Sequence, residues 1–90
     1  MQKRIAVYSI AQEKARFSFC AEIAQLDERC VEIVDNHAVV FQSNKTIDEL
    51  HKLLISNCLQ SGDEAWILTL DRPYTGNGIT HERLKAFLLK

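Results

Sequence analysis

The sequence begins with a strand pattern that is apolar on both sides, and this feature constrains the fold more than any other. Alternate residues of a strand point to opposite faces of its sheet. In the segment "RIAVYSI", one set of alternate positions holds Ile5, Val7 and Ser9, and the other holds Ala6, Tyr8 and Ile10. Because apolar side chains occupy both faces, we expect other parts of the protein to cover both.

The periodicity of the rest of the chain predicts the order of the remaining elements. The capping-box spacing of Thr46 and Glu49 marks the start of a helix. After the first strand we predict a helix over 13–26, a hairpin with strands over 31–34 and 37–42, a helix over 47–59, a strand over 64–71 and a helix over 80–90. This order predicts one α+β domain over 1–90, a ferredoxin-like βαββαβ split fold with an extra C-terminal helix.

Two helices cover only one face of a four-stranded sheet, so the second apolar face requires another cover. The C-terminal helix, a second subunit or both are the candidates. We expect a homodimer whose interface includes Trp66 and Ile67, together with the apolar residues Ala6, Tyr8 and Ile10 of the first strand. Phe17 projects away from the apolar stripe of its helix, and we therefore assign it to a contact surface as well.

Composition and charge exclude several classes of protein. Eleven Lys and Arg nearly balance twelve Asp and Glu, so a net charge of -1 gives no overall cationic field for nucleic acid. The sequence contains no apolar run of membrane-spanning length and no signal-peptide pattern, so we expect a cytoplasmic protein without a membrane partner. Its three cysteines form no CxxC pair, which predicts reduced thiols and neither a disulfide framework nor a zinc site.

Three segments resemble the small ferredoxin-like proteins of the VapD toxin and CRISPR adaptation (Cas-two) families. They are the opening run "AVYSI…KAR", the strand "HAVVFQS" that leads into a capped helix, and the closing strand "AWILTLD". The resemblance covers roughly residues 4 to 72. It implies a symmetric dimer across the open face of the sheet. It also implies a magnesium-dependent nuclease in which an aspartate at the end of the first strand is the proposed metal ligand.

The position of that aspartate falls on Ser9 in this sequence. Magnesium is bound by carboxylate oxygens, and a neutral hydroxyl provides none of the charge that retains the ion and activates its water. Glu13 and Asp71 are the alternative carboxylates, from the start of the first helix and the end of the last strand. A solvated surface position, or a charge that stabilises a helix start, is the simpler interpretation of both acids.

Basic residues on either side of the first strand suggest a local patch for phosphate groups. Lys3, Arg4, Lys14 and Arg16 lie around Tyr8 in the sequence, and Tyr8 is a candidate for stacking on a base. A scattered charged surface explains the same residues. The three histidines have no spacing that brings them together at a metal or a nucleophile.

These observations favour a binding module over an enzyme. The resemblance implies a regulatory or inhibitory protein that acts on a nucleic acid or nucleoprotein, in a toxin–antitoxin, phage-defence or mobile-element setting. We expect no catalytic residue, no bound metal and no cofactor. The alternatives are a metal-dependent endoribonuclease that uses Glu13 or Asp71 with magnesium, and a protein-binding inhibitor of a defence complex.

Overall fold

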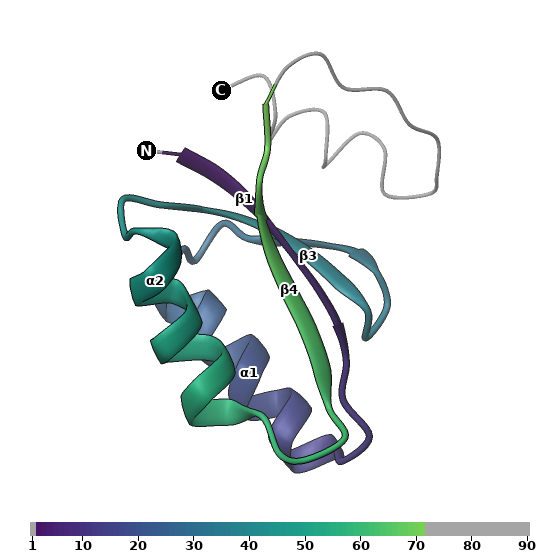
Figure 1. Ribbon diagram of the computed structural model, residues 1–90. Helices are drawn as coiled ribbons and strands as arrows, with labels where there is room; N and C mark the ends of the chain where they lie inside the picture. The colour runs from purple at the N-terminus through teal and green to yellow at the C-terminus, as the bar shows by residue number, and fades with distance from the viewer. Residues whose placement is uncertain (1, 72–90) are drawn as a thin grey trace.

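The computed structural model describes residues 2–71 of the protein (Figure 1). The elements are β1 (Gln2–Ser9), α1 (Glu13–Leu26), β2 (Val31–Val34), β3 (Ala38–Ser43), α2 (Ile47–Leu50), the π-helical segment η1 (His51–Ser56) and β4 (Glu64–Thr69). The predicted helix over 80–90 lies outside the described residues. No helix within 2–71 combines the length and the apolar character that crossing a bilayer requires.

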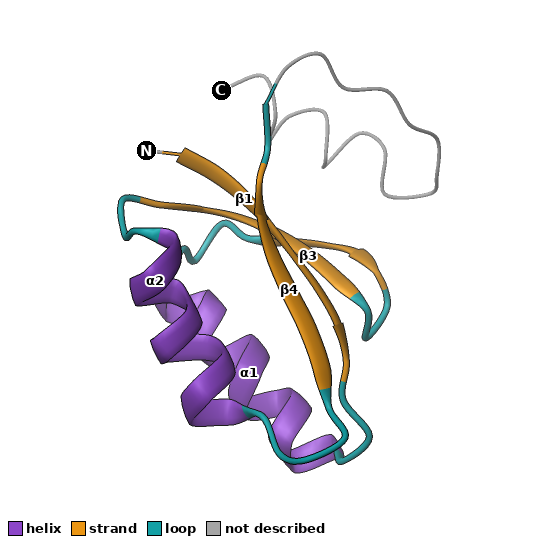
Figure 2. Cartoon of the chain, viewed as in Figure 1, coloured by secondary structure: helices purple, strands orange, loops and turns teal. Residues whose placement is uncertain are grey.

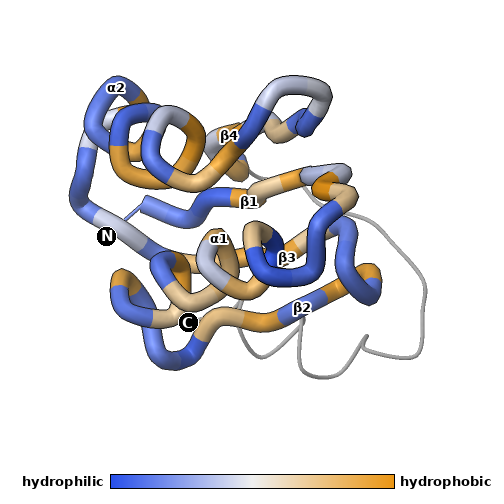
Figure 3. Tube along the Cα trace, turned by 90° about the horizontal axis from the view of Figure 1, so that it is seen from below, coloured by the Kyte–Doolittle hydropathy of each residue, from blue (hydrophilic) through white to orange (hydrophobic). Residues whose placement is uncertain are grey.

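The four strands form one antiparallel sheet in the order β2-β3-β1-β4, which Figure 3 shows in view from below. β1 is central, because it pairs with β3 on one side and with β4 on the other. The architecture is therefore α+β, and it is compatible with the ferredoxin-like fold that the sequence predicts.

Both helices lie on the same side of the sheet, as Figure 2 shows. The main core between the two layers contains Ala6 and Tyr8 of β1, Phe19 and Ile23 of α1, and Leu54 of η1. The Tyr8 and Phe19 rings lie 4.9 Å apart between their centroids. This packing identifies the even-numbered residues of β1 as the face that the helices cover.

The structure corrects our prediction of the uncovered face. Ala6, Tyr8 and Ile10 were expected at an interface with Ile67, but these β1 and loop residues are buried in the core, and Ile67 packs against it. The open face instead carries the odd-numbered residues of β1, with Trp66 as the cross-strand partner of Val7. The sequence predicted the alternation correctly but assigned the helices to the wrong side.

Local signals fix the connections between elements. The Thr46 hydroxyl accepts a hydrogen bond from the backbone amide of Glu49, with an N···O distance of 3.1 Å. The Glu49 carboxylate accepts one from the backbone amide of Thr46 at 3.0 Å. These two bonds confirm the capping box. These hydrogen bonds lower the pKa of Glu49. Asn36, with φ of 62°, occupies the predicted turn between β2 and β3, a left-handed conformation that asparagine tolerates.

Candidate interaction surface

The structure separates Ser9 from Asp71, one of the two carboxylates of the nuclease alternative. Ser9 is exposed and pairs with Glu64, the first residue of β4. Because β4 is antiparallel to β1, its last residues lie beside Lys3 instead, where the Leu70 amide donates to the Lys3 carbonyl at 2.8 Å. Asp71 is therefore about 20 Å from Ser9 along the strand. The antiparallel direction of β4 therefore keeps Asp71 away from the position that the resemblance assigns to a metal ligand.

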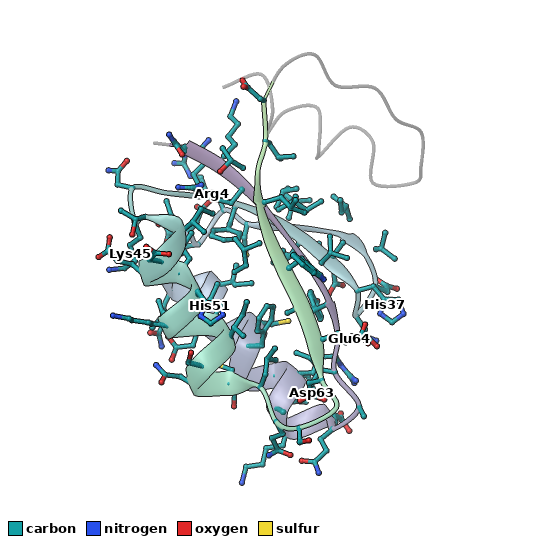
Figure 4. The ribbon with its side chains drawn as sticks, in the orientation of Figure 1. Arg4, His37, Lys45, His51, Asp63 and Glu64 are labelled. Carbon is teal, nitrogen blue, oxygen red and sulfur yellow. The ribbon has the colours of Figure 1, made fainter. Side chains whose placement is uncertain are left out.

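The other candidates for metal or catalytic chemistry are also separated. Glu13 is exposed at the first position of α1. His37 follows the hairpin turn, whereas His51 lies on the helical layer, well apart from it in Figure 4. Within residues 2–71, no group of three or more His, Cys, Asp or Glu side chains is arranged to hold a metal ion.

One residue of the predicted basic patch is buried in the core layer. Arg4 is 5% exposed, and its guanidinium donates to the Thr69 hydroxyl and, at 3.0 Å, to the Lys45 carbonyl. The Arg4 side chain therefore links β1 to β4 and to the segment before α2. Figure 4 labels Arg4 and Lys45. This guanidinium holds the fold together and is not presented to a phosphate.

Tyr8 is likewise unsuited to stacking on a base. Its side chain is 3% exposed and packs on Phe19, and its hydroxyl lies 3.4 Å from the Cys20 sulfur. Burial, followed by this hydrogen bond, raises the pKa of Tyr8 far above the usual value for tyrosine. The predicted role of Tyr8 as an exposed aromatic is wrong, because the even-numbered face of β1 is the covered one.

The remaining basic residues do not form one patch. Lys3 lies near the beginning of β1, whereas Lys14 and Arg16 belong to α1, which starts beyond the other end of that strand. The Arg16 guanidinium donates to the Ile10 carbonyl at 3.3 Å. These positions weaken the argument for a nucleic-acid rim around the first strand and helix.

The open face of the sheet brings together apolar residues from all four strands. The strand register places them in two rows that cross the sheet, which we call the apolar band: Val34–Ala38–Val7–Trp66 and Val31–Val40–Ile5–Leu68. A shift in the β2–β3 register between Glu32 and Val34 keeps both Val31 and Val34 on this face. No helix of residues 2–71 covers the band, because both helices pack on the opposite face (Figure 2).

Exposure within the apolar band is uneven. Val31 and Val40 are buried in a small second cluster with Ile5, Ile33 and Leu70. Trp66 is 71% exposed, and Val7, Val34 and Leu68 also remain exposed. The band therefore presents a large indole and three aliphatic side chains to the surroundings. Protein interfaces characteristically enclose such side chains within a polar rim.

Polar pairs border the apolar band at both ends. Ser9 and Glu64 form the next pair beyond Val7 and Trp66. Lys3 and Gln42 form the corresponding pair beyond Ile5 and Val40. One end of the open face thus carries a carboxylate and the other carries an ammonium group. The two ends of the open face, measured along its strands, therefore differ in charge.

The outcome for the predicted contact residues differs from residue to residue. Trp66 lies on the open face as an interface residue would, whereas Ile67 points to the core. Phe17 is 63% exposed on α1, as its departure from the buried stripe predicted, but it faces away from the sheet. Val7 and Leu68 were missed, although their cross-strand positions next to Trp66 and Ile5 follow once β4 is placed antiparallel to β1.

Comparison with family models, with curated proteins and with solved structures finds no match to this chain.

Proposed function

We propose that the protein is a non-catalytic binding module that works through protein contacts, and that a second copy of the chain covers the apolar band. The observation that carries this proposal is the pair of apolar rows across all four strands, bounded by polar residues at both ends. A regulatory or inhibitory role fits a small domain that has an interaction surface and, in its described part, no group of three or more His, Cys, Asp or Glu side chains arranged to hold a metal ion.

The charges at the two ends support a second copy as the occupant. A two-fold axis that runs across the strands would reverse strand direction in the partner. Glu64 of each subunit would then approach Lys3 of the other, and the apolar rows would pack on each other between them. An axis along the strands would bring like charges together instead. The first arrangement is therefore the one we propose.

A protein partner is favoured over a nucleic acid for the surface that remains free in the dimer. Two of the five residues expected to contact nucleic acid, Arg4 and Tyr8, are buried, and the other three do not gather. The net charge of -1 adds no attraction to phosphate. These facts support the interpretation of the protein as a protein-binding regulator or inhibitor.

The experiment places a charge in the middle of the apolar band. Val7 is 41% exposed in the band, and Ile47 is 42% exposed at the start of α2, so Val7→Lys and Ile47→Lys form a matched pair. We expect light scattering to give a dimer mass for the wild-type protein and for Ile47→Lys, and a monomer mass for Val7→Lys. Circular dichroism verifies that both variants fold.

Two outcomes would contradict the proposal. A wild-type protein that stays monomeric at high micromolar concentration excludes the second copy as the occupant. Magnesium- or manganese-dependent cleavage of single-stranded RNA by the purified wild-type protein excludes a non-catalytic role. Glu13→Gln and Asp71→Asn would then identify whether either carboxylate of the nuclease alternative takes part.

A further inference from the structure

The outer edge of β4 has backbone groups that the sheet does not use. Successive residues of an antiparallel strand direct their N–H and C=O groups alternately to one neighbour and to the other side. The Leu70 amide donates a hydrogen bond to the Lys3 carbonyl in β1, so the backbone N–H and C=O groups of Trp66 and Leu68 also face β1. Ala65, Ile67 and Thr69 consequently direct their N–H and C=O groups outward. No other strand within 2–71 pairs with that edge.

The opposite edge of the sheet is protected in a way that β4 is not. β2 has four residues, and its pairing with β3 is interrupted between Glu32 and Val34. β4 has six residues in uninterrupted register with β1 and contains neither proline nor lysine. Short, bulged or lysine-bearing edges resist the addition of strands, whereas long regular edges accept them. The two edges therefore differ in their capacity to accept another strand.

The charges around β4 indicate which strand would fit. Asp63 and Glu64 lie at its start, and Asp71 follows its end. A second β4 centred on Ile67 in antiparallel pairing would place Asp63 of each copy opposite Asp71 of the other. Like charges in directly opposed positions destabilise a strand pair. A strand with basic residues at both ends would meet carboxylates at both ends instead.

We propose that the outer edge of β4 binds an extended segment of a protein partner, with alternating apolar residues and a basic residue at each end, as an added strand. The three outward-facing residues would supply the backbone hydrogen bonds. The apolar side chains of the added strand would lie beside Trp66 and Leu68 and extend the apolar band. This inference rests on the proposed role in protein binding, but it requires no dimer.

Amide hydrogen exchange on the full-length protein tests the proposal residue by residue. In the free protein, we expect the outward amides of Ala65, Ile67 and Thr69 to exchange quickly and those of Trp66 and Leu68 to exchange slowly. The probe is a synthetic peptide of alternating valine and threonine, as long as β4, with lysines at both ends. Its addition should slow exchange at the three outward amides, and a peptide with glutamates at both ends should not.

Two substitutions separate backbone pairing from charge. Ala65→Pro removes one outward donor without removing a bond to β1, and Ala65→Ser is its control because it keeps the amide. We expect Ala65→Pro to weaken binding of the lysine-ended peptide about three- to tenfold, the effect of losing one hydrogen bond. Glu64→Lys should reduce the preference for the lysine-ended peptide over the glutamate-ended one. If Ala65→Pro fails to fold, the slowing of exchange at the three outward amides of the wild-type protein by the lysine-ended peptide tests the proposal.

Several results would overturn this inference. Slow exchange of the outward amides in dilute free protein would mean that the chain itself occupies the edge. Protection of these three amides that rises with protein concentration without peptide, in Val7→Lys as in the wild-type protein, would identify a second copy as the occupant of the edge. Unchanged exchange with saturating lysine-ended peptide would rule out strand addition. Light scattering on the same samples tests the dimer separately, so the two proposals fail independently.

Discussion

Trp66→Ala gives the most direct measure of the surface that we assign to the dimer. A tryptophan side chain buries up to about 250 Å². With 71% of Trp66 exposed, about 180 Å² is left to bury in an interface. At about 25 cal/mol per Å², this area is worth up to about 4 kcal/mol for each subunit. Allowing for the methyl group that alanine retains, we expect a loss of about 2 to 4 kcal/mol per subunit.

A symmetric dimer contains this residue twice, so the expected loss of association free energy is about 4 to 8 kcal/mol. The dimer dissociation constant should then rise at least about 10³-fold. Stability of the monomer should change by less than about 1 kcal/mol, because the side chain is mostly exposed and lies opposite Val7 in an edge-strand pair.

Light scattering over a dilution series measures the dimer dissociation constant. Urea unfolding at protein concentrations below that constant measures the stability of the monomer. Phe17→Ala is the matched control, because Phe17 is also an exposed aromatic but lies on α1, away from the open face. We expect Phe17→Ala to remain dimeric. A dimer that survives Trp66→Ala with an unchanged dissociation constant would refute the argument, and dissociation by Phe17→Ala alone would move the interface to α1.

Further predictions concern the core, the helix cap and the end of β1. Tyr8→Phe should remove part of the loss of stability at high pH. Burial raises the folded-state pKa of Tyr8, so this residue alone should lower the wild-type free energy of unfolding by about 1.4 kcal/mol per pH unit above about pH 10. The difference between the two proteins in urea unfolding measures this contribution. Cys58, whose pKa is also raised by burial, acts in the same direction and remains in both. Thr46→Ala should cost about 1 kcal/mol of stability in the same assay, and Thr46→Ser should retain most of it. Ser9→Asp should lower the free energy of unfolding by about 0.2 to 1 kcal/mol in the presence of a chelator, because the new carboxylate opposes Glu64. Added magnesium should restore part of this loss of stability. An unchanged free energy of unfolding in low salt would contradict the pairing of Ser9 with Glu64.

The positions of most elements followed from sequence because each has a local cause. The capping box of Thr46 and Glu49 set the start of α2, and the turn at Asn36 separated β2 from β3. The alternation in β1 was also predicted correctly. These signals depend on residues close together in the chain, which is why they needed no knowledge of the tertiary structure.

The choice of the covered face did not follow from sequence because both faces of β1 and β4 are apolar. In β4 the largest side chain, Trp66, points to the open face together with Leu68, whereas the core receives Ala65 and Ile67. A rule that places the most apolar face inward therefore selects the wrong side. The buried guanidinium of Arg4 adds to the ambiguity, because a charged residue usually marks an exposed face.

The open face and the β4 edge share the Trp66 and Leu68 side chains, and this shared boundary couples the two proposals. A strand added to β4 would extend the apolar rows from four strands to five, so each subunit of a dimer would bury more apolar area. A peptide that binds the edge should therefore tighten the dimer, and by linkage the dimer should bind the peptide more tightly by the same factor. Trp66 is the only tryptophan of the chain, so its emission reports burial at this boundary without a label. A peptide affinity that is identical for the monomeric Val7→Lys variant and for the wild-type dimer would show that the two surfaces act independently.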